Sequence, residues 1–121
     1  MFIATSNKAR QLLCLTYIDE VHPDELVRNR ADVLALLAEM TPGFRLLANL
    51  SQLKAMNVEC HEEIGAVMEK FDQAGVGMIV RVIPDNSKDI GLNILAVFHY
   101  QNKPKIVTCQ NMVEAARALG L

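Results

Sequence analysis

Long apolar runs and blocks of like charge are both missing from this sequence of 121 residues. No apolar stretch approaches the roughly 20 residues that a helix needs to cross a bilayer, so we expect no membrane span. The 12 lysines and arginines are scattered along the chain instead of forming a basic stripe, and the formal net charge is −2. A nucleic-acid partner is therefore not expected.

Paired cysteine motifs are missing as well. The chain has three cysteines, which lie far apart and form no CxxC pair: Cys14, Cys60 and Cys109. This pattern is typical of a reducing compartment, where thiols stay free. The short apolar run after Lys8 and Arg10 lacks a small-residue cleavage site, so it does not predict a signal peptide. We expect a cytoplasmic protein with free thiols.

The sequence also lacks a complete catalytic motif and a glycine-rich phosphate loop. Gly75 and Gly77 precede an expected strand, whereas a dinucleotide-binding loop follows one. His61 is next to Cys60, but adjacent helical residues point in different directions, so His61 is badly placed to act as a base for the thiol. No His–x3–His pair is present to bind a metal. The sequence therefore predicts a protein that is not an enzyme and needs no cofactor or metal.

Apolar residues are abundant. Hydrophobic residues make up 51% of the chain and charged residues 21%, a balance that excludes a disordered polymer. A chain of this length can form one domain, 1–121, whose core needs no disulfide or metal to support it. The apolar surplus also leaves surface through which a homodimer could form.

Short apolar runs predict five strands. Two β-type runs, at 2–5 and 11–18, flank turn-forming residues and indicate a hairpin. Continuous apolar runs at 44–50 and 76–83 predict strands that are covered on both faces, and hence interior and parallel. A last short strand is expected at 105–109.

Helical periodicity predicts four helices between and after these strands. They begin near Pro23, Asn57, Ser87 and Asn111, and Gly75 is suited to a left-handed cap at the end of the second. The apolar faces expected for the first three are Leu26, Val27, Leu34, Leu37 and Ala38; Ile64, Val67, Met68 and Phe71; and Ile90, Ile94, Val97 and Phe98. The order β-β-α-β-α-β-α-β-α predicts an α/β fold with a mixed, mainly parallel sheet.

Three stretches of the chain resemble a known family. YIDE at 17–20 is similar to the family's entry into its first helix, and LLANLS at 46–51 is similar to a strand that reads V-L-x-D-L-S in relatives. IVTCQNMVEAA at 106–116 is similar to the family's last strand and helix. By these stretches and their order the chain resembles the STAS domain family of anti-sigma-factor antagonists, in its SpoIIAA-like branch. The likeness covers almost the whole chain and implies that fold and a regulatory role.

The resemblance also indicates a regulatory position. Phosphorylated members carry Asp-Ser-Ser-Gly at the start of the second helix, where a partner kinase modifies a serine. The matching residues here, within one position, are Asn57, Val58, Glu59 and Cys60. Glu59 therefore stands at the phosphoacceptor position, the acceptor serine is missing, and regulation by such a kinase is in doubt. Asn49, where relatives often have aspartate, is a second departure.

The leading hypothesis is a non-enzymatic regulatory domain that binds a protein partner through residues 51–63. The candidate partner-binding residues are Ser51, Met56, Asn57, Val58, Glu59, Cys60, Glu62 and Glu63. We expect Met56 to be the exposed apolar anchor and Cys60, in the first helical turn, to be the most reactive thiol unless it is buried. A simpler interpretation is structural: Asn57 is an N-cap, and the glutamates favour the positive end of the helix dipole.

The second hypothesis is a small-ligand or lipid-binding module of the same fold. It follows from the likeness of the SpoIIAA-like branch to lipid-carrier folds. It requires an apolar cavity between the sheet and its helices.

Overall fold

An antiparallel hairpin begins the chain. Strand β1 (Phe2–Asn7) pairs with β2 (Leu12–Val21), and the turn between them is closed by a hydrogen bond of 3.1 Å from the Gln11 N–H to the Lys8 carbonyl. The computed structural model describes residues 1–83 and 99–121. The hairpin that the sequence predicted is confirmed, with both strands longer than expected.

The remaining strands of the described chain extend this hairpin into one sheet. They are β3 (Arg45–Met56), β4 (Met78–Val82) and β5 (Lys105–Cys109), and the sheet order is β1-β2-β3-β4-β5. The pairs β2–β3, β3–β4 and β4–β5 are parallel. The expected mixed, mainly parallel sheet is therefore confirmed, and so are the interior positions of β3 and β4.

Strand β3 continues further than the apolar run predicted. Its second half pairs with the end of β2, with register shifts on either side of Ile18 and Asp19. Asp19 has a positive φ of 55°, which places it in the left-handed region at this irregularity. In this half Leu50 and Leu53 are buried, whereas Ser51, Gln52 and Lys54 are exposed, so the continuous apolar run of the first half does not continue.

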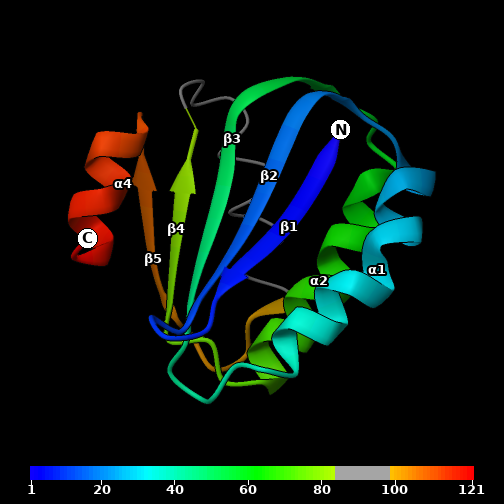
Figure 1. The fold of residues 1–121 in the computed structure, drawn as a ribbon. Coiled ribbons are helices and arrows are strands. Elements are labelled where there is room, and N and C mark those ends of the chain that lie inside the picture. The colour runs from blue at the N-terminus through cyan, green and yellow to red at the C-terminus, as the bar shows by residue number, and fades with distance from the viewer. Residues whose placement is uncertain (84–98) are drawn as a thin grey trace.

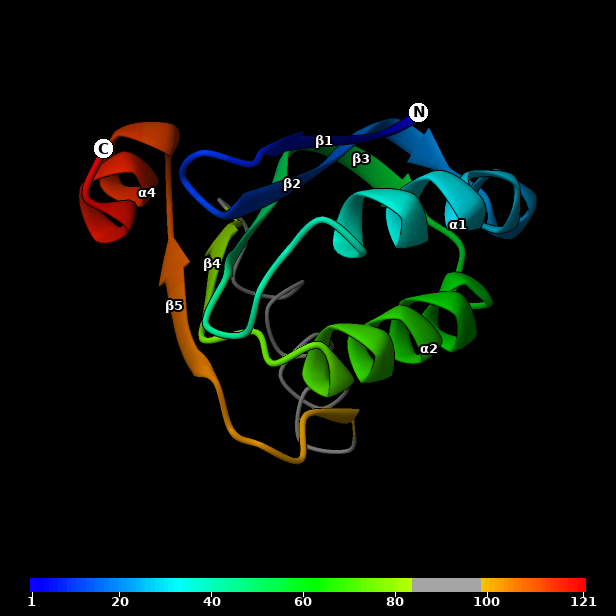
Figure 2. The same cartoon turned by 60° about the horizontal axis from the view of Figure 1, so that its bottom comes forward.

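Helices cover both faces of the sheet (Figures 1 and 2). Helix α1 (Pro23–Leu37) and α2 (Cys60–Gln73) lie side by side against one face, and α4 (Met112–Leu119) packs on β4 and β5 from the other. The apolar face predicted for the third helix, Ile90, Ile94, Val97 and Phe98, lies outside the described residues, as does Ser87.

Strand β4 has the most deeply buried side chains, because both of its faces are covered. Ile79 belongs to the core under α1 and α2, whereas Val80 and Val82 belong to the core under α4. These three side chains are at most 2% exposed. The two-sided burial that the apolar run predicted is thus observed.

The ends of two helices follow the predicted local chemistry. Asn111 caps α4 by accepting the Glu114 N–H at 2.9 Å, and Gly120 ends it with φ 71°. Gly75 follows α2 with φ 86°, and a side chain there would meet Pro42 at 3.1 Å. Glycine is therefore required at position 75 for both its backbone angle and its close approach.

The apolar face predicted for α1 was only partly right. Leu26 and Leu37 are buried, but Val27 is 49% exposed and Ala38 lies on the surface, while Val33 is 2% exposed. Buried positions 26, 33 and 37 follow the helical repeat of 3.6 residues, whereas Val27 is turned by about 100° from Leu26. Adjacent apolar residues on a helix therefore do not share its buried stripe.

The chain segment that follows the undescribed residues returns against α2. His99 contacts Glu69 through an Nδ1···Oε1 distance of 2.8 Å, and its ring lies over Gly65, where an added Cβ would meet Nε2 at 2.6 Å. The Asn102 N–H donates to the buried Asp72 carboxylate at 3.0 Å. Both contacts hold residues 99–102 against α2.

We expect Phe71→Ala to lower the free energy of unfolding by roughly 3–5 kcal/mol, because a buried phenyl ring is removed and a cavity is left. Phe71 is 2% exposed and lies on the inner face of α2. Urea unfolding measures the change, and Lys70→Ala, at the exposed neighbouring position, serves as the control. Equal unfolding midpoints for the two variants would show that the inner face of α2 has been assigned wrongly.

Candidate functional site

The loop between β3 and α2 forms a tight turn before the helix begins. The Asn57 side-chain Oδ1 accepts the Glu59 N–H at 2.8 Å, and the Asn57 carbonyl accepts the Cys60 N–H at 2.9 Å. The residue at the N-cap position of α2 is Glu59, and its side chain makes no capping hydrogen bond. Asn57 therefore stabilises the turn ahead of the helix, and the N-cap lies two residues later than predicted.

The structure separates the eight predicted partner-binding residues. Those on the surface are Ser51, Asn57, Val58, Glu59 and Glu62. Met56 is partly buried and packs against the core, so it is not the exposed anchor expected from the sequence. The apolar side chain that projects is that of Val58, which is 72% exposed.

Cys60 lies inside the protein and cannot contact a partner in this structure. It is 0% exposed, and its Sγ lies 3.6 Å from the Val21 carbonyl oxygen. Burial raises the pKa of the Cys60 thiol, and this effect outweighs the hydrogen bond of the helix start. The expectation of a reactive thiol, which held only for an exposed side chain, therefore does not apply. All three cysteines are free, as predicted.

Glu63 faces the other way, toward α1, and forms an ion pair with Arg30. The Arg30 Nε donates to Glu63 Oε2 at 3.1 Å, and the Arg30 Nη2 donates to Oε1. The Glu63 side chain is 13% exposed and that of Arg30 49%. Hydrogen bonding to Glu63 raises the pKa of the Arg30 guanidinium further, so the guanidinium stays charged.

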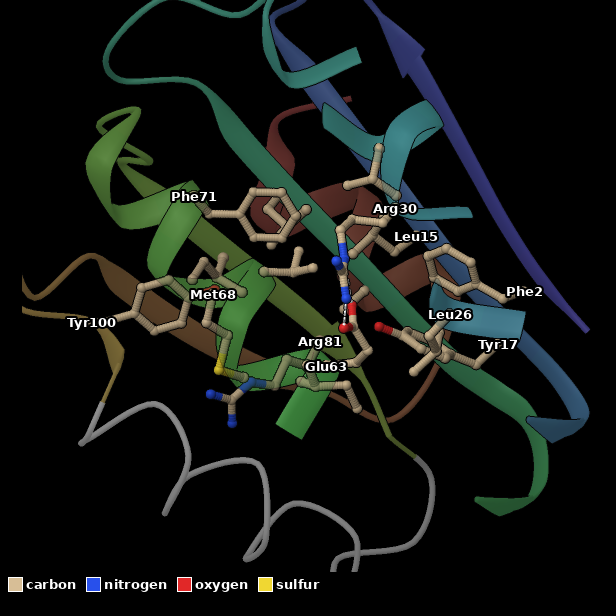
Figure 3. Close-up of a pocket in the computed structure, with 16 residues that line it drawn as sticks. Phe2, Leu15, Tyr17, Leu26, Arg30, Glu63, Met68, Phe71, Arg81 and Tyr100 are labelled. Atoms are coloured by element: carbon tan, nitrogen blue, oxygen red, sulfur yellow. Dashed lines mark hydrogen bonds and ion pairs between the residues drawn. The ribbon is translucent and has the colours of Figure 1, made fainter. Parts of the chain in front are cut away.

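A cavity lies between the sheet and helices α1 and α2 (Figure 3). Its volume is about 60 Å³. The residues that line it come from β1, β2, β3, β4, α1, α2 and Tyr100, and they are mostly apolar: Phe2, Leu15, Tyr17, Leu26, Arg30, Val33, Leu46, Ala48, Glu63, Ile64, Val67, Met68, Phe71, Ile79, Arg81 and Tyr100. The cavity that the second hypothesis required is therefore present.

The strand register explains where the space comes from. Ala48 of β3 lies in register with Leu15 of β2 on one side and Arg81 of β4 on the other. Because alanine is the smallest side chain in that row, the centre of the sheet leaves room beneath the helices. Helix α2 lines the opposite side with Ile64 and Met68, among others.

Besides the ion pair, three of the residues that line the cavity carry polar groups: Tyr17, Arg81 and Tyr100. Burial raises the pKa of both Tyr17 and Tyr100 above the ordinary phenol value, so both hydroxyl groups stay protonated at neutral pH. The nearby Arg81 guanidinium, on a side chain that is 2% exposed, partly offsets the shift at Tyr100. The Tyr17 ring also packs on Phe2, with ring centroids 5.1 Å apart. The cavity thus offers neutral hydroxyl groups within an apolar lining.

Sequence reasoning missed most of this site. Arg30 and Glu63 are 33 positions apart, and nothing in the local sequence pairs them. One signal was available, because Arg81 interrupts the buried apolar run of β4, and a buried arginine usually has a polar partner or a function.

Within residues 1–83 and 99–121, no group of three or more His, Cys, Asp or Glu side chains is arranged to hold a metal ion. No helix in that part of the chain is long and apolar enough to span a bilayer.

Comparison with solved structures shows the fold. An uncharacterized protein of the DUF3478 family from Shewanella loihica PV-4, described as having a SpoIIAA-like fold, matches with a TM-score of 0.74 and 9% identity. The match covers 98% of this chain and 92% of that one. The anti-sigma factor antagonist SpoIIAA in its unphosphorylated form matches with a TM-score of 0.64 and 14% identity over the whole of both chains. No protein-family model and no curated protein matches the sequence. The chain has a SpoIIAA-like fold.

We expect Cys14 to be alkylated first in the folded protein, and Cys60 and Cys109 only after unfolding. Cys14 is partly exposed, whereas the other two are buried. Burial raises the pKa of all three thiols, so each reacts more slowly at pH 8 than a free cysteine. Iodoacetamide labelling followed by mass spectrometry measures the order, with urea-unfolded protein as the control. Labelling of Cys60 as fast as Cys14 would contradict the burial described above.

Proposed function

We propose that this chain is a non-enzymatic, STAS-like regulatory domain that binds a small apolar ligand between its sheet and helices α1 and α2. The cavity is the observation that carries the proposal. The likeness of the fold to that of an anti-sigma factor antagonist supports a regulatory role. No reaction is part of the proposal: the ligand is held, not converted.

The lining determines the class of ligand. Side chains such as Leu26, Val33 and Phe71 offer dispersion contacts but no hydrogen bonds, so the ligand is mainly hydrocarbon. The protonated hydroxyl of Tyr17 can donate one hydrogen bond to a polar atom of the ligand.

Size limits the ligand further. The cavity of about 60 Å³ is smaller than the apolar cavity of about 150 Å³ that binds benzene in an engineered protein. In the conformation described, it has room for a ligand of a few heavy atoms, whereas a longer ligand requires α1 and α2 to move apart.

The proposal predicts that Ala48→Leu weakens ligand binding by at least about tenfold, because the larger side chain fills the cavity. Xenon, which enters small apolar cavities, is a suitable probe. Chemical-shift changes of the Ile64 and Ile79 methyl groups during xenon titration measure its affinity. Ala66→Leu is the matched control, since Ala66 lies on the exposed side of α2.

Xenon shifts at these methyl groups in the wild type and Ala66→Leu, but not in Ala48→Leu, are the expected result. Equal xenon affinity in all three proteins would locate the binding elsewhere and contradict the proposal. A melting temperature measured for each variant confirms that it is folded.

Protein binding through the start of α2 is the second candidate function. The observation that favours it is Val58, an apolar side chain 72% exposed among the polar residues Asn57, Glu59 and Glu62. Exposed apolar side chains with a polar rim are typical of protein interfaces. Ser51 is exposed on β3, whereas Cys60 is buried and contributes nothing to this surface.

Glu59 has a defined part in this second candidate. It is exposed at the N-cap position of α2 and brings one negative charge to the positive end of the helix dipole. By the resemblance to the STAS family it also lies, within one position, where phosphorylated members carry the acceptor serine. We propose that it holds the surface in a single signalling state. Equal partner affinity for Glu59→Ser and the wild type would exclude this role.

We expect Val58→Asp to abolish binding of a protein partner, because an apolar contact is replaced by a charge. Val27→Asp is the matched control: Val27 is also exposed, at 49%, but lies on α1. Affinity purification with the two variants and the wild type as baits compares them directly. A partner that is retained equally by Val58→Asp and the wild type does not use this surface.

A further inference from the structure

The Arg30–Glu63 ion pair lies on the cavity wall and links the two helices that cover it. Both residues line the cavity, Arg30 from α1 and Glu63 from the first turn of α2. Among the hydrogen bonds and ion pairs formed by residues 1–83 and 99–121, only those of this pair join α1 to α2. Apolar side chains of the two helices, among them Leu26 and Ile64, also belong to one core.

The pair lies at the boundary between the cavity and the solvent. The Arg30 side chain is 49% exposed and the Glu63 side chain 13%, so the guanidinium faces water while the carboxylate is largely covered. Leu26, one helical turn before Arg30, and Ile64, the residue after Glu63, line the cavity beneath them. In Figure 3 the hydroxyl group of Tyr17 points toward the pair from the cavity side.

The pair has a defined geometry, but its exposure to solvent makes it weak. Two parallel N–H···O bonds fix the Arg30 guanidinium against the Glu63 carboxylate, the arrangement that arginine favours with carboxylates. An ion pair this accessible to water is nevertheless only slightly favourable and is screened by salt. It can therefore open and re-form without unfolding the domain.

We propose that Arg30 and Glu63 form a gate: the closed pair holds α1 and α2 together over the cavity, and ligands larger than the cavity enter only when it opens. This inference rests on the proposed apolar-ligand function and adds its control of access. The cavity volume of about 60 Å³ supports it, because a ligand larger than a few heavy atoms has no room while the helices are held together.

Two neutral probes test the gate. Xenon is small enough for the cavity as it stands, whereas N-phenyl-1-naphthylamine, whose fluorescence increases in apolar surroundings, is too large for it. Because neither probe is charged, removing a charge from the protein does not change its electrostatic attraction for the probe.

The variant pair is Arg30→Ala and Arg28→Ala. Arg28 is on the same helix and also forms an ion pair, but its partner Asp24 is one turn away on α1, at 3.2 Å, so that pair links nothing to α2. Both side chains are exposed, and both variants lose one positive charge. Any difference between them therefore reports the link between the helices.

In stopped-flow mixing, we expect Arg30→Ala to bind and release N-phenyl-1-naphthylamine roughly two- to fivefold faster than the wild type. This ratio corresponds to the small free energy by which an exposed ion pair favours the closed state. Arg28→Ala should match the wild type, and xenon affinity should be equal in all three proteins. Raising the salt concentration to about 1 M, where the Debye length is about 3 Å, should speed binding to the wild type but not to Arg30→Ala.

Equal N-phenyl-1-naphthylamine rates for Arg30→Ala and Arg28→Ala would overturn the gate while leaving the ligand site intact. Xenon binding without any binding of the larger probe would also overturn it, because the helices would not open. If neither probe binds to any of the three proteins, the ligand-binding function fails, and the gate fails with it.

Discussion

The burial of β4 and of the first half of β3 on both faces is the constraint on which the rest of the structure depends. Parallel strands with continuous apolar side chains cannot leave either face in water, so the chain must supply helices to both. Helices α1 and α2 cover one face, and α4 covers the other (Figure 2). Because the strands are parallel, their connections return over the sheet, and the loop that starts α2 is placed at its carboxyl edge.

The cavity results from the way in which α1 and α2 pack on the sheet. Two helices that pack on a twisted sheet touch it along ridges, and a small side chain in the sheet leaves space where no ridge reaches. Ala48 supplies that small side chain, and the Arg30–Glu63 ion pair joins the two helices on the cavity wall. Such an ion pair contributes little to stability where it is exposed to solvent, and the proposed gate depends on that weakness.

The sequence could predict those parts of the fold that local patterns specify. Apolar runs are enough to find β3 and β4, and a capping asparagine and a glycine are enough to find both ends of α4, at Asn111 and Gly120. The STAS resemblance added the arrangement of these elements, which the fold comparison confirms. The structural role of Asn57 was recognised in kind, as a side chain that accepts a backbone N–H, although the helix itself begins later.

The candidate site was far less predictable, because it is made by contacts between distant residues. Cys60 is buried by packing near Val21, 39 positions earlier, and no local rule shows that burial will outweigh the helix start in setting the reactivity of the thiol. Whether Met56 or Val58 projects from the surface depends on where β3 ends, and the mostly polar, exposed second half of that strand gives no sequence signal for its end. Helix propensity and periodicity describe one element at a time, whereas the cavity belongs to five or more elements at once.

Helix α2 connects the two candidate functions physically. Its inner face, which includes Met68 and Phe71, lines the cavity, while the turn that leads into it exposes Val58. A helix of 14 residues is held by its own backbone hydrogen bonds and moves as a rigid element of about 21 Å. Glu63 stands where these two parts of the helix meet, in the first turn and on the cavity wall. A separation of the two helices in which α2 moves would also displace the surface around Val58, and binding of a larger ligand would then be coupled to binding of a partner.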